Sequence, residues 1–248
     1  MRIGLIVGTG MDFLTPLEEW HEVPTPYGAA YLATAELGGM EVALLRRHGP
    51  MLNIPPHLIN YHASMHALKE LGIQCVLATA AVGSMRKELQ PGDMAVVGDF
   101  IDFTKRRNCT AFDQPGEVVV HVDFSRPYCP VVSSAMEQAA RELGISMGRR
   151  VTYMCVDGPR YETPAEVKMF AQWGGDVVGM TGVPEVVLAR EMGMCYGALA
   201  IMTNYAAGVT DQPLSHQEVL ACMSERQRSV QGILSRAVAL IPEDHTCF

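Results

Sequence analysis

The sequence has no long run of lysine and arginine, and its 27 acidic residues outnumber its 19 basic residues, giving a formal net charge of −8. Nucleic acids and anionic membranes require a concentrated basic surface, so neither is expected as a partner. The apolar run near the N-terminus, residues 3–7, is too short for a signal peptide or a membrane span. These absences predict a cytoplasmic protein, in which a small anionic ligand would need only a local positive site.

The seven cysteines show no arrangement typical of a metal site, because the sequence contains no CxxC motif and no visible cluster of cysteine with histidine. We therefore predict that no metal is bound. The odd number of cysteines, and the apolar surroundings of Cys75 and Cys155, predict buried thiols in a reducing compartment. The seven positions are Cys75, Cys109, Cys129, Cys155, Cys195, Cys222 and Cys247.

A complete nucleotide-binding motif is also missing. Gly8, Thr9 and Gly10 follow the first apolar run, but the third glycine of a dinucleotide fingerprint and the lysine of a P-loop are both lacking. A Rossmann cofactor is therefore not expected. The two glycines would still let the backbone approach a ligand while Thr9 offers a hydroxyl group, although an ordinary turn is the alternative interpretation.

What the sequence does contain is an alternation of short apolar runs with amphipathic helical patterns. This order predicts an α/β fold with a central mixed, largely parallel sheet flanked by helices. The 248 residues, with 48% hydrophobic content, are sufficient for one domain spanning residues 1–248. A long aperiodic segment, residues 99–130, is typical of a functional loop. The strand-like runs are residues 3–7, 42–45, 75–80, 94–97, 151–155, 177–180 and 196–202, and the helical patterns are residues 58–71, 131–143, 165–173, 183–192 and 219–240.

Two helix starts are marked by capping boxes. Thr163 is followed by a proline and then, at the third position, by a glutamate, and Ser215 has a glutamate at the same spacing. Tyr161 and Glu162 are therefore expected in a loop just ahead of one helix, and His216 on the first turn of the other. Loops at such helix starts are where ligand sites are usually built.

Candidate anion-binding groups occur at two points. In residues 176–185 an apolar strand leads to the hydroxyl group of Thr181 and then to a helix start, where unpaired backbone amides and the helix dipole would attract an anion. Arg47 and His48 follow another apolar run, at the sheet edge where α/β proteins bind ligands. The arginine fork suits oxyanions, and histidine can add a donor. An ordinary strand-to-helix connection and a solvated basic loop are the alternatives.

Glu162 and Asn204 form a second candidate pair. Asn204 follows a strongly apolar run, so its polar side chain is expected where the core opens to a ligand. Separately, the small residues 79–84 end another strand and leave room for a ligand, or else for close packing of strand on helix. A carboxylate accepts hydrogen bonds from ring N–H groups, whereas an amide both donates and accepts. Together they could recognise the edge of a 6-oxopurine base. The alternative is an acid at a helix end and an asparagine in a turn.

With these motifs in order, the chain resembles the trimeric purine nucleoside phosphorylase family, and more closely its 5'-methylthioadenosine phosphorylase branch. The resemblance implies phosphorolysis, in which inorganic phosphate attacks the anomeric carbon of a nucleoside and releases a purine base and a ribose 1-phosphate. It implies phosphate as co-substrate and no cofactor. The matching motifs are Gly8-Thr9-Gly10, Arg47-His48-Gly49, Asn60-Tyr61, Gln90-Pro91-Gly92-Asp93, His121, Gly158-Pro159-Arg160-Tyr161, Met180-Thr181 and Val183-Pro184-Glu185-Val186.

The resemblance also implies roles for individual residues. Tyr161 would lie along the base, Met180 would touch the sugar, and His121 would be lent to the pocket by a neighbouring subunit of a homotrimer. Asn204, Glu162 and His48 are the candidate catalytic residues, with Asn204 donating a hydrogen bond to N7 of the leaving purine. The phosphate-binding residues implied are Thr9, Arg47, His48, Ala81 (through its amide) and Thr181.

The resemblance implies the reaction more narrowly than it implies the substrate. Methylthioadenosine enzymes typically carry an acid where this chain has Asn204, and they lack a glutamate at the position of Glu162, so we predict a preference for 6-oxopurines. His216 would suit a 5'-hydroxyl group, whereas Met51 and Leu52 follow the methylthio branch, so inosine, guanosine and methylthioinosine all remain candidates. The alternatives are a 5'-methylthioadenosine phosphorylase, a nucleosidase that uses water, and a non-catalytic nucleoside-binding protein.

Overall fold

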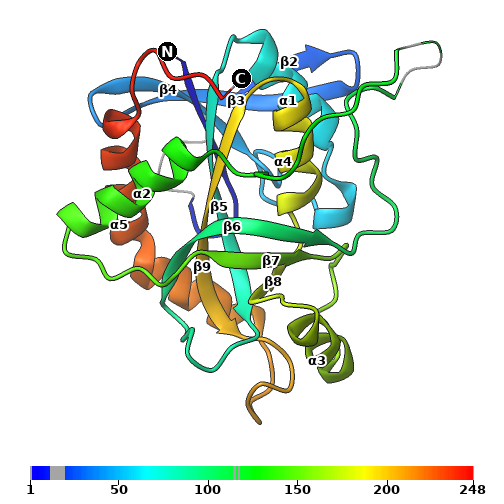
Figure 1. The fold of residues 1–248 in the computed structure, drawn as a ribbon, viewed down its shortest axis with the longest axis vertical. Helices are drawn as coiled ribbons and strands as arrows, with labels where there is room; N and C mark the ends of the chain where they lie inside the picture. The colour runs from blue at the N-terminus through cyan, green and yellow to red at the C-terminus, as the bar shows by residue number, and fades with distance from the viewer. Residues whose placement is uncertain (1, 12–19, 114–115, 117, 248) are drawn as a thin grey trace.

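The computed structural model describes residues 2–11, 20–113, 116 and 118–247 of the chain, and Figure 1 shows how its helices surround a central sheet. The strands are β1 (Ile3–Val7), β2 (His21–Thr25), β3 (Gly28–Leu37), β4 (Met40–Arg46), β5 (Cys75–Ser84), β6 (Met94–Asp102), β7 (Val151–Cys155), β8 (Val177–Gly179) and β9 (Cys195–Tyr205). The helices are the 3-10 helix η3 (Pro56–Leu58), α1 (Tyr61–Glu70), α2 (Pro130–Glu142), α3 (Pro164–Gln172), α4 (Gly182–Glu191) and α5 (His216–Leu240).

The sheet runs in the order β2-β3-β4-β1-β5-β8-β7-β6-β9, and β9 also pairs with β5. This extra pairing closes β5, β8, β7, β6 and β9 into a ring, from which β1, β4, β3 and β2 extend as an open sheet. Five of the nine strand pairings within the described residues are parallel and four are antiparallel. The prediction of an α/β fold with a mixed, largely parallel sheet flanked by helices is therefore confirmed.

The topology opens a gap beside β5 at the edge where the parallel strands β4, β1, β5 and β9 end. On one side of β5, the register with β1 stops at Ala78, and pairing with β8 begins only at Gly83. Among the described residues no strand covers the four positions between them on that side. The carboxyl ends of parallel strands are where α/β folds bind ligands, and this gap places backbone and side chains of β5 at the same edge.

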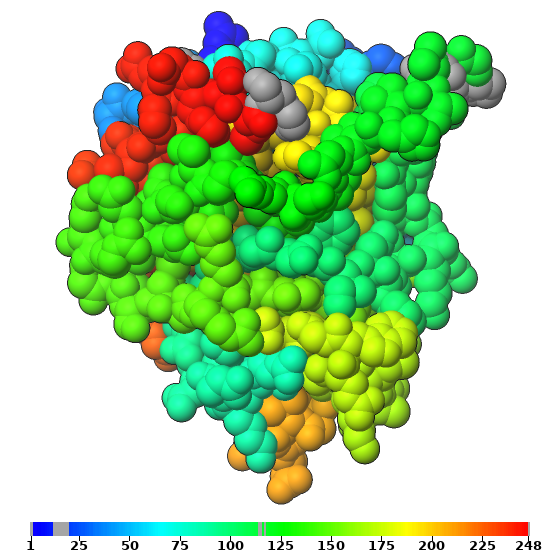
Figure 2. All heavy atoms as spheres, viewed as in Figure 1, coloured from blue at the N-terminus to red at the C-terminus, as the bar shows by residue number. Residues whose placement is uncertain are grey.

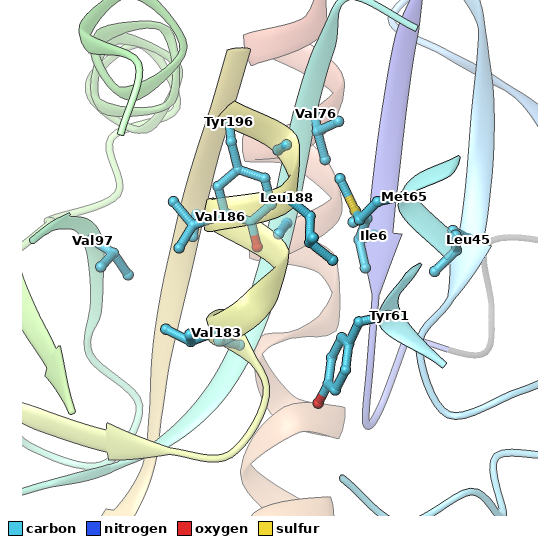
Figure 3. Close-up of a cluster of buried hydrophobic side chains, with 14 of the residues drawn as sticks. Ile6, Leu45, Tyr61, Met65, Val76, Val97, Val183, Val186, Leu188 and Tyr196 are labelled. Carbon is cyan, nitrogen blue, oxygen red and sulfur yellow. The ribbon is translucent and has the colours of Figure 1, made fainter. Parts of the chain in front are cut away.

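The two faces of the sheet carry separate apolar layers. On one face, residues of α1 and α4 pack with β1, β5 and β9, and Figure 3 shows Met65 and Leu188 converging on Ile6 and Val76. On the other face, residues of α2 and α5 pack against the opposite side of the same strands. Because both faces are covered, the central strands are apolar along almost their whole length, which is why they were predictable from sequence.

All seven predicted strands and all five predicted helices are present, with ends that differ by a few residues. Strands β2 and β3 were missed. β2 is an edge strand, largely exposed and interrupted by Pro24, so it lacks the alternating apolar pattern that identifies strands. The predicted long loop begins later than expected, because β6 continues to Asp102. Its positions 114, 115 and 117 lie outside the described residues.

The prediction of buried thiols is wrong for Cys195 and Cys247, which form a disulfide, and the free thiols of Cys109 and Cys222 are only partly buried. Cys75, Cys129 and Cys155 are buried free thiols, as expected. The prediction that cysteine and histidine form no cluster is also wrong. Tertiary contacts bring Cys129, Cys195, Cys247 and His245 together although they lie far apart in sequence. In the described part of the chain, no helix has both the length and the apolar character needed to cross a membrane.

Candidate active site

A cavity of about 430 Å³ opens at the sheet edge where β1, β4, β5 and β9 end. Its remaining walls come from residues 52–56, the segment before α3, the end of β8 with the connection to α4, and the start of α5. The cavity therefore gathers every site residue predicted from the sequence except His121. Its polar lining consists of Thr9, Arg47, His48, Asn53, Thr79, Tyr161, Glu162, Thr181, Thr203, Asn204 and His216.

Arg47 is the fixed cation of the cavity and is only 4% exposed. Its Nε and Nη2 atoms donate to the two carboxylate oxygens of Glu185 at 2.5 and 2.9 Å, and its Nη1 atom donates to the Thr79 carbonyl at 2.9 Å. A guanidinium group has five N–H donors, so these three bonds leave two for a ligand. The bidentate ion pair holds the plane of the guanidinium group before any ligand arrives.

Glu185 was missed as a site residue, because the sequence analysis named it only within a motif that matches the phosphorylase family and gave it no role. It is 1% exposed and also accepts a hydrogen bond from the Tyr196 hydroxyl at 2.8 Å. Burial alone would lower the pKa of Arg47, but the adjacent Glu185 carboxylate outweighs this effect and raises it. The available signal was a single acid inside the apolar run 183–188, because a buried acid requires a buried cation.

His48 lies beside Arg47 in a defined tautomer. Its Nδ1 atom is 2.8 Å from the Ile54 carbonyl, and since a carbonyl only accepts, Nδ1 carries the proton and Nε2 is left as an acceptor. Burial lowers the pKa of His48, and the bond to Ile54 offsets this only in part. The expectation that His48 donates to an anion thus requires a protonated ring, which burial disfavours.

Gly8 gives Arg47 and His48 the space they occupy. A Cβ atom at this position would lie 2.8 Å from Arg47 Nη1 and 3.8 Å from His48 Nε2. The first distance is shorter than real Cβ contacts, so a side chain here would displace the guanidinium group. The glycine in the turn after β1 therefore makes room for a side chain of this protein, whereas its predicted close approach to a ligand stays a prediction.

The prediction of unpaired backbone amides at Thr181 is wrong. The amides of Thr181 and Gly182 donate to the Tyr153 hydroxyl at 3.1 and 3.4 Å. The backbone of Val183 is not helical, with φ −114° and ψ 131°, so the start of α4 is kinked rather than a regular helix terminus. Thr181 can therefore offer its hydroxyl group to a ligand, but its amide is already used. At this end of α4 the cavity therefore offers an anion side-chain groups rather than a regular helix terminus.

A β-bulge aims Asn204 into the cavity. Along the β5–β9 pairing, Val82 is opposite Met202 and Gly83 is opposite Asn204, so Thr203 is the extra residue. Bulges of this kind re-aim side chains and are common beside active sites. A sequence pattern does not reveal them, because they depend on the register between two strands.

Hydrogen bonds fix the orientation of the Asn204 amide. Its Oδ1 atom accepts from the Thr203 hydroxyl at 2.9 Å, and its Nδ2 atom donates to the Tyr205 carbonyl at 2.9 Å. One N–H of Nδ2 is left for a ligand. The amide is thus held in place as a donor before substrate binds.

Glu162 supplies the acidic group of the cavity and is 8% exposed. Burial raises the pKa of its carboxyl group. It directly precedes α3, whose capping box between Thr163 and Glu166 is present as predicted. Arg160 adds a bidentate ion pair to Glu166, with N–O distances of 2.7 and 2.8 Å. These contacts brace the loop that carries Tyr161 and Glu162.

The other predicted residues lie at the rim or outside. Tyr161 and Met180 are half-buried in the lining, and His216, the first residue of α5, is exposed at the rim. Ser215 caps α5 by accepting from the Glu218 amide at 3.2 Å. His121 is exposed and does not line the cavity.

Comparisons with known proteins show which enzymes the whole chain resembles. A protein of Moorella thermoacetica named "Probable 6-oxopurine nucleoside phosphorylase" is 47% identical over 250 residues, covering 100% of this chain and 96% of the relative. An S-methyl-5'-thioadenosine phosphorylase of Pyrococcus horikoshii is 43% identical over 248 residues, covering 99% of this chain and 95% of the relative.

Solved structures show the same likeness. The structure of methylthioadenosine phosphorylase from Schistosoma mansoni in complex with adenine matches with a TM-score of 0.90 at 32% identity, covering 97% of this chain and 92% of that chain. Residues 2–239 match the family described as the phosphorylase superfamily. Because the match extends over almost the whole sequence and fold, this protein belongs to the phosphorylase superfamily.

Proposed function

We propose that this protein catalyses the phosphorolysis of 6-oxopurine nucleosides to a free base and a ribose 1-phosphate. The observation that carries the proposal is one cavity that joins a buried cation, Arg47, to an acid and an amide suited to a purine, Glu162 and Asn204. The relatives named as 6-oxopurine and methylthioadenosine phosphorylases support the reaction class. Inorganic phosphate is the co-substrate, and we propose that no cofactor takes part.

In this proposal, phosphate binds at the end of the cavity formed by the turns after β1 and β4. Arg47 offers its two remaining N–H groups, and Thr9 and Thr181 offer hydroxyl groups. Ala81 would contribute its amide from the part of β5 that lies beside the gap between β1 and β8. His48 would accept a proton from the phosphate monoanion at Nε2, which leaves the more nucleophilic dianion beside the sugar.

The base binds between Glu162 and Asn204. The Glu162 carboxylate accepts the ring N–H of a 6-oxopurine, and the spare N–H of Asn204 donates to N7. The glycosidic bond breaks through an oxocarbenium-like state, so negative charge develops on the purine and positive charge on the sugar. A fixed donor at N7 stabilises the negative charge on the purine. Bound phosphate stabilises the positive charge on the sugar and is already placed to attack it. Tyr161 would lie along the base.

A second candidate substrate class carries a 5'-methylthio group. The lining of the cavity that includes His216 also includes the apolar side chains of Leu52, Ile54, Val219 and Leu220. These favour a thioether over a hydroxyl group, so methylthioinosine joins inosine and guanosine as a candidate. Methylthioadenosine is the further alternative, with Met180 against the sugar in each case.

We also propose that the active form is a homotrimer in which His121 completes the site of a neighbouring subunit. His121 follows three exposed valines, of which Val118 and Val119 are 80% and 76% exposed. In Figures 1 and 2 this green segment projects at the upper right and then crosses the face of the molecule in front of α4. Such an apolar, exposed run suits burial against another copy. A cytoplasmic location stays a prediction from sequence.

A substrate panel with and without phosphate tests the proposal. We expect base release from inosine, guanosine or methylthioinosine only when phosphate is present, with formation of a ribose 1-phosphate, and much slower release from adenosine and methylthioadenosine. Equal release without phosphate would identify a nucleosidase, and base binding without turnover would identify a binding protein. Sedimentation of the same sample should give three times the chain mass of 27.1 kDa, and an active monomer would contradict the role of His121.

The pH dependence of the reaction provides a separate check on Glu162. Burial raises the pKa of this carboxyl group above the ordinary 4.5, and the proposed role requires the ionised form. As the pH falls through the raised pKa, the carboxylate is protonated and stops accepting from the base, so kcat/KM for inosine should fall at a pH above 4.5. The Glu162→Gln variant should lose this acid limb of the profile.

Glu166→Gln is the matched control for the pH profile. Its carboxyl group is bonded to Arg160 and has a pKa lowered to about 2, so this variant should keep the acid limb. The role of Glu162 is contradicted if Glu162→Gln keeps the same acid limb as the wild type.

A further inference from the structure

Four metal-binding side chains meet at the end of the sheet opposite the proposed active site. Cys195 is the first residue of β9, Cys129 directly precedes α2, and His245 and Cys247 lie in the C-terminal segment after α5. Their Sγ and imidazole nitrogen atoms all lie within 4.8 Å of one another. Figure 1 shows the red C-terminal segment returning to the end of the molecule where β9 begins.

The distances from the imidazole to the three sulfur atoms suit one tetrahedral ion, although two of those sulfurs are joined in a disulfide. His245 Nε2 lies 3.2 Å from Cys129 Sγ, 3.5 Å from Cys195 Sγ and 3.7 Å from Cys247 Sγ. Zinc bonds of about 2.3 Å to sulfur and about 2.0 Å to nitrogen place tetrahedral sulfur and nitrogen ligands about 3.5 Å apart. All three distances from the imidazole therefore already match the edges of such a site.

The surroundings favour thiolate ligands held by a stiff backbone. Cys129 is the N-cap of α2, and its Sγ atom accepts from the Val132 amide at 3.5 Å, where the helix dipole stabilises negative charge. The Cys129 amide donates to the Tyr196 carbonyl at 2.8 Å, and the Cys195 amide donates to the Gln74 carbonyl at 2.8 Å. Two of the ligands are thus fixed to the core of the fold, and the other two belong to one short segment.

We propose that, when Cys195 and Cys247 are reduced, Cys129, Cys195, Cys247 and His245 bind one divalent cation of the zinc class. Three thiolates with one imidazole are a donor set typical of closed structural zinc sites. Cys195 and Asn204 are nine residues apart on the same strand, roughly 30 Å at about 3.3 Å per residue, so the ion would not take part in phosphorolysis. It would fasten the C-terminal segment to α2 and β9.

The disulfide between Cys195 and Cys247 is the alternative state of the same cluster. A phosphine reductant converts it to two thiols: the phosphine gives up two electrons and takes an oxygen atom from water, whose two protons go to the sulfurs. Binding of Zn²⁺ then displaces the three thiol protons. The disulfide leaves only Cys129 and His245 as donors, so the oxidised and metal-bound states exclude each other.

Metal analysis of the intact chain tests the site. Protein reduced with a phosphine, incubated with Zn²⁺ and passed through a desalting column should retain about one zinc per chain, as expected for a closed four-ligand site. Cys129→Ser and His245→Ala should each lose most of this zinc. Cys109→Ser is the matched control, because Cys109 is a free cysteine outside the cluster, and it should retain zinc as the wild type does.

A second measurement uses the wild-type protein, so its result does not depend on whether the variants fold. Zn²⁺ should protect Cys129, Cys195 and Cys247 from alkylation, read by peptide mass spectrometry, and a chelator should remove the protection. Co²⁺ should give the intense visible absorption of a tetrahedral thiolate site. The proposal is overturned if reduced wild-type protein retains no zinc, if zinc protects none of the three cysteines, or if the disulfide resists the phosphine in the folded chain.

Discussion

Replacement of Asn204 with alanine is expected to lower kcat for inosine by about 10²- to 10³-fold, the usual cost of removing one fixed donor to developing negative charge. The Asn204 amide is held by Thr203 and the Tyr205 carbonyl, so its spare N–H is fixed toward the cavity before the base carries charge. Because phosphate binds elsewhere in the cavity, the KM for phosphate should change little. Steady-state kinetics with inosine and phosphate varied in turn measures both effects.

Asn204→Asp is the matched variant, since it keeps the shape of the side chain. A carboxyl group can share a proton with N7 of adenine and accept from its 6-amino group, whereas an amide suits a 6-oxopurine. The preference should therefore move toward adenine nucleosides, measured as the ratio of kcat/KM for methylthioadenosine to that for methylthioinosine. An unchanged ratio in Asn204→Asp, together with full activity in Asn204→Ala, would remove Asn204 from the site.

Replacement of Glu185 with glutamine is expected to lower the free energy of unfolding by about 3–5 kcal/mol, because it leaves the charge of Arg47 buried without its partner. The same change frees the guanidinium group from its bidentate contact, so the KM for phosphate should also rise. Chemical denaturation measures the first effect, and kinetics with varied phosphate measures the second. Added phosphate should recover part of the lost stability, because it binds the folded state and supplies negative charge.

Asp176→Asn is the matched control for this test. Asp176 is also a buried carboxylate, 3% exposed, and it binds Arg149 and Arg86 away from the cavity. Its partners are partly exposed to water, so the loss of stability should be smaller. The KM for phosphate should stay as in the wild type, and added phosphate should stabilise this variant no more than it stabilises the wild type. Tyr196→Phe removes only one hydrogen bond to Glu185 and should cost about 1 kcal/mol. A Glu185→Gln variant with wild-type KM for phosphate would show that the ion pair is structural only.

The fold could be predicted to a large extent because its signals are local. Central strands such as β5 and β9 are apolar along their length, and the cap of α3 at Thr163 is set by residues a few positions apart. Most residues of the candidate site could also be predicted, because side chains that directly follow parallel strands lie at one edge of the sheet. Strand β2, at the edge of the sheet and largely exposed, lacks that apolar signal, and it was missed together with β3, which pairs with it.

The sequence by itself determined the order of the helices and of seven of the nine described strands, and which side chains reach the end of the sheet, because periodicity and capping act within one helix or strand. Only the tertiary structure decided how those groups are used. Arg47 meets Glu185 across 138 positions, Tyr153 occupies the Thr181 amide from 28 positions away, and Cys129 meets His245 across 116. Such contacts depend on strand register and on how the helices pack on the sheet. A local sequence pattern covers only a few neighbouring residues, so it cannot predict which distant residues the fold brings into contact.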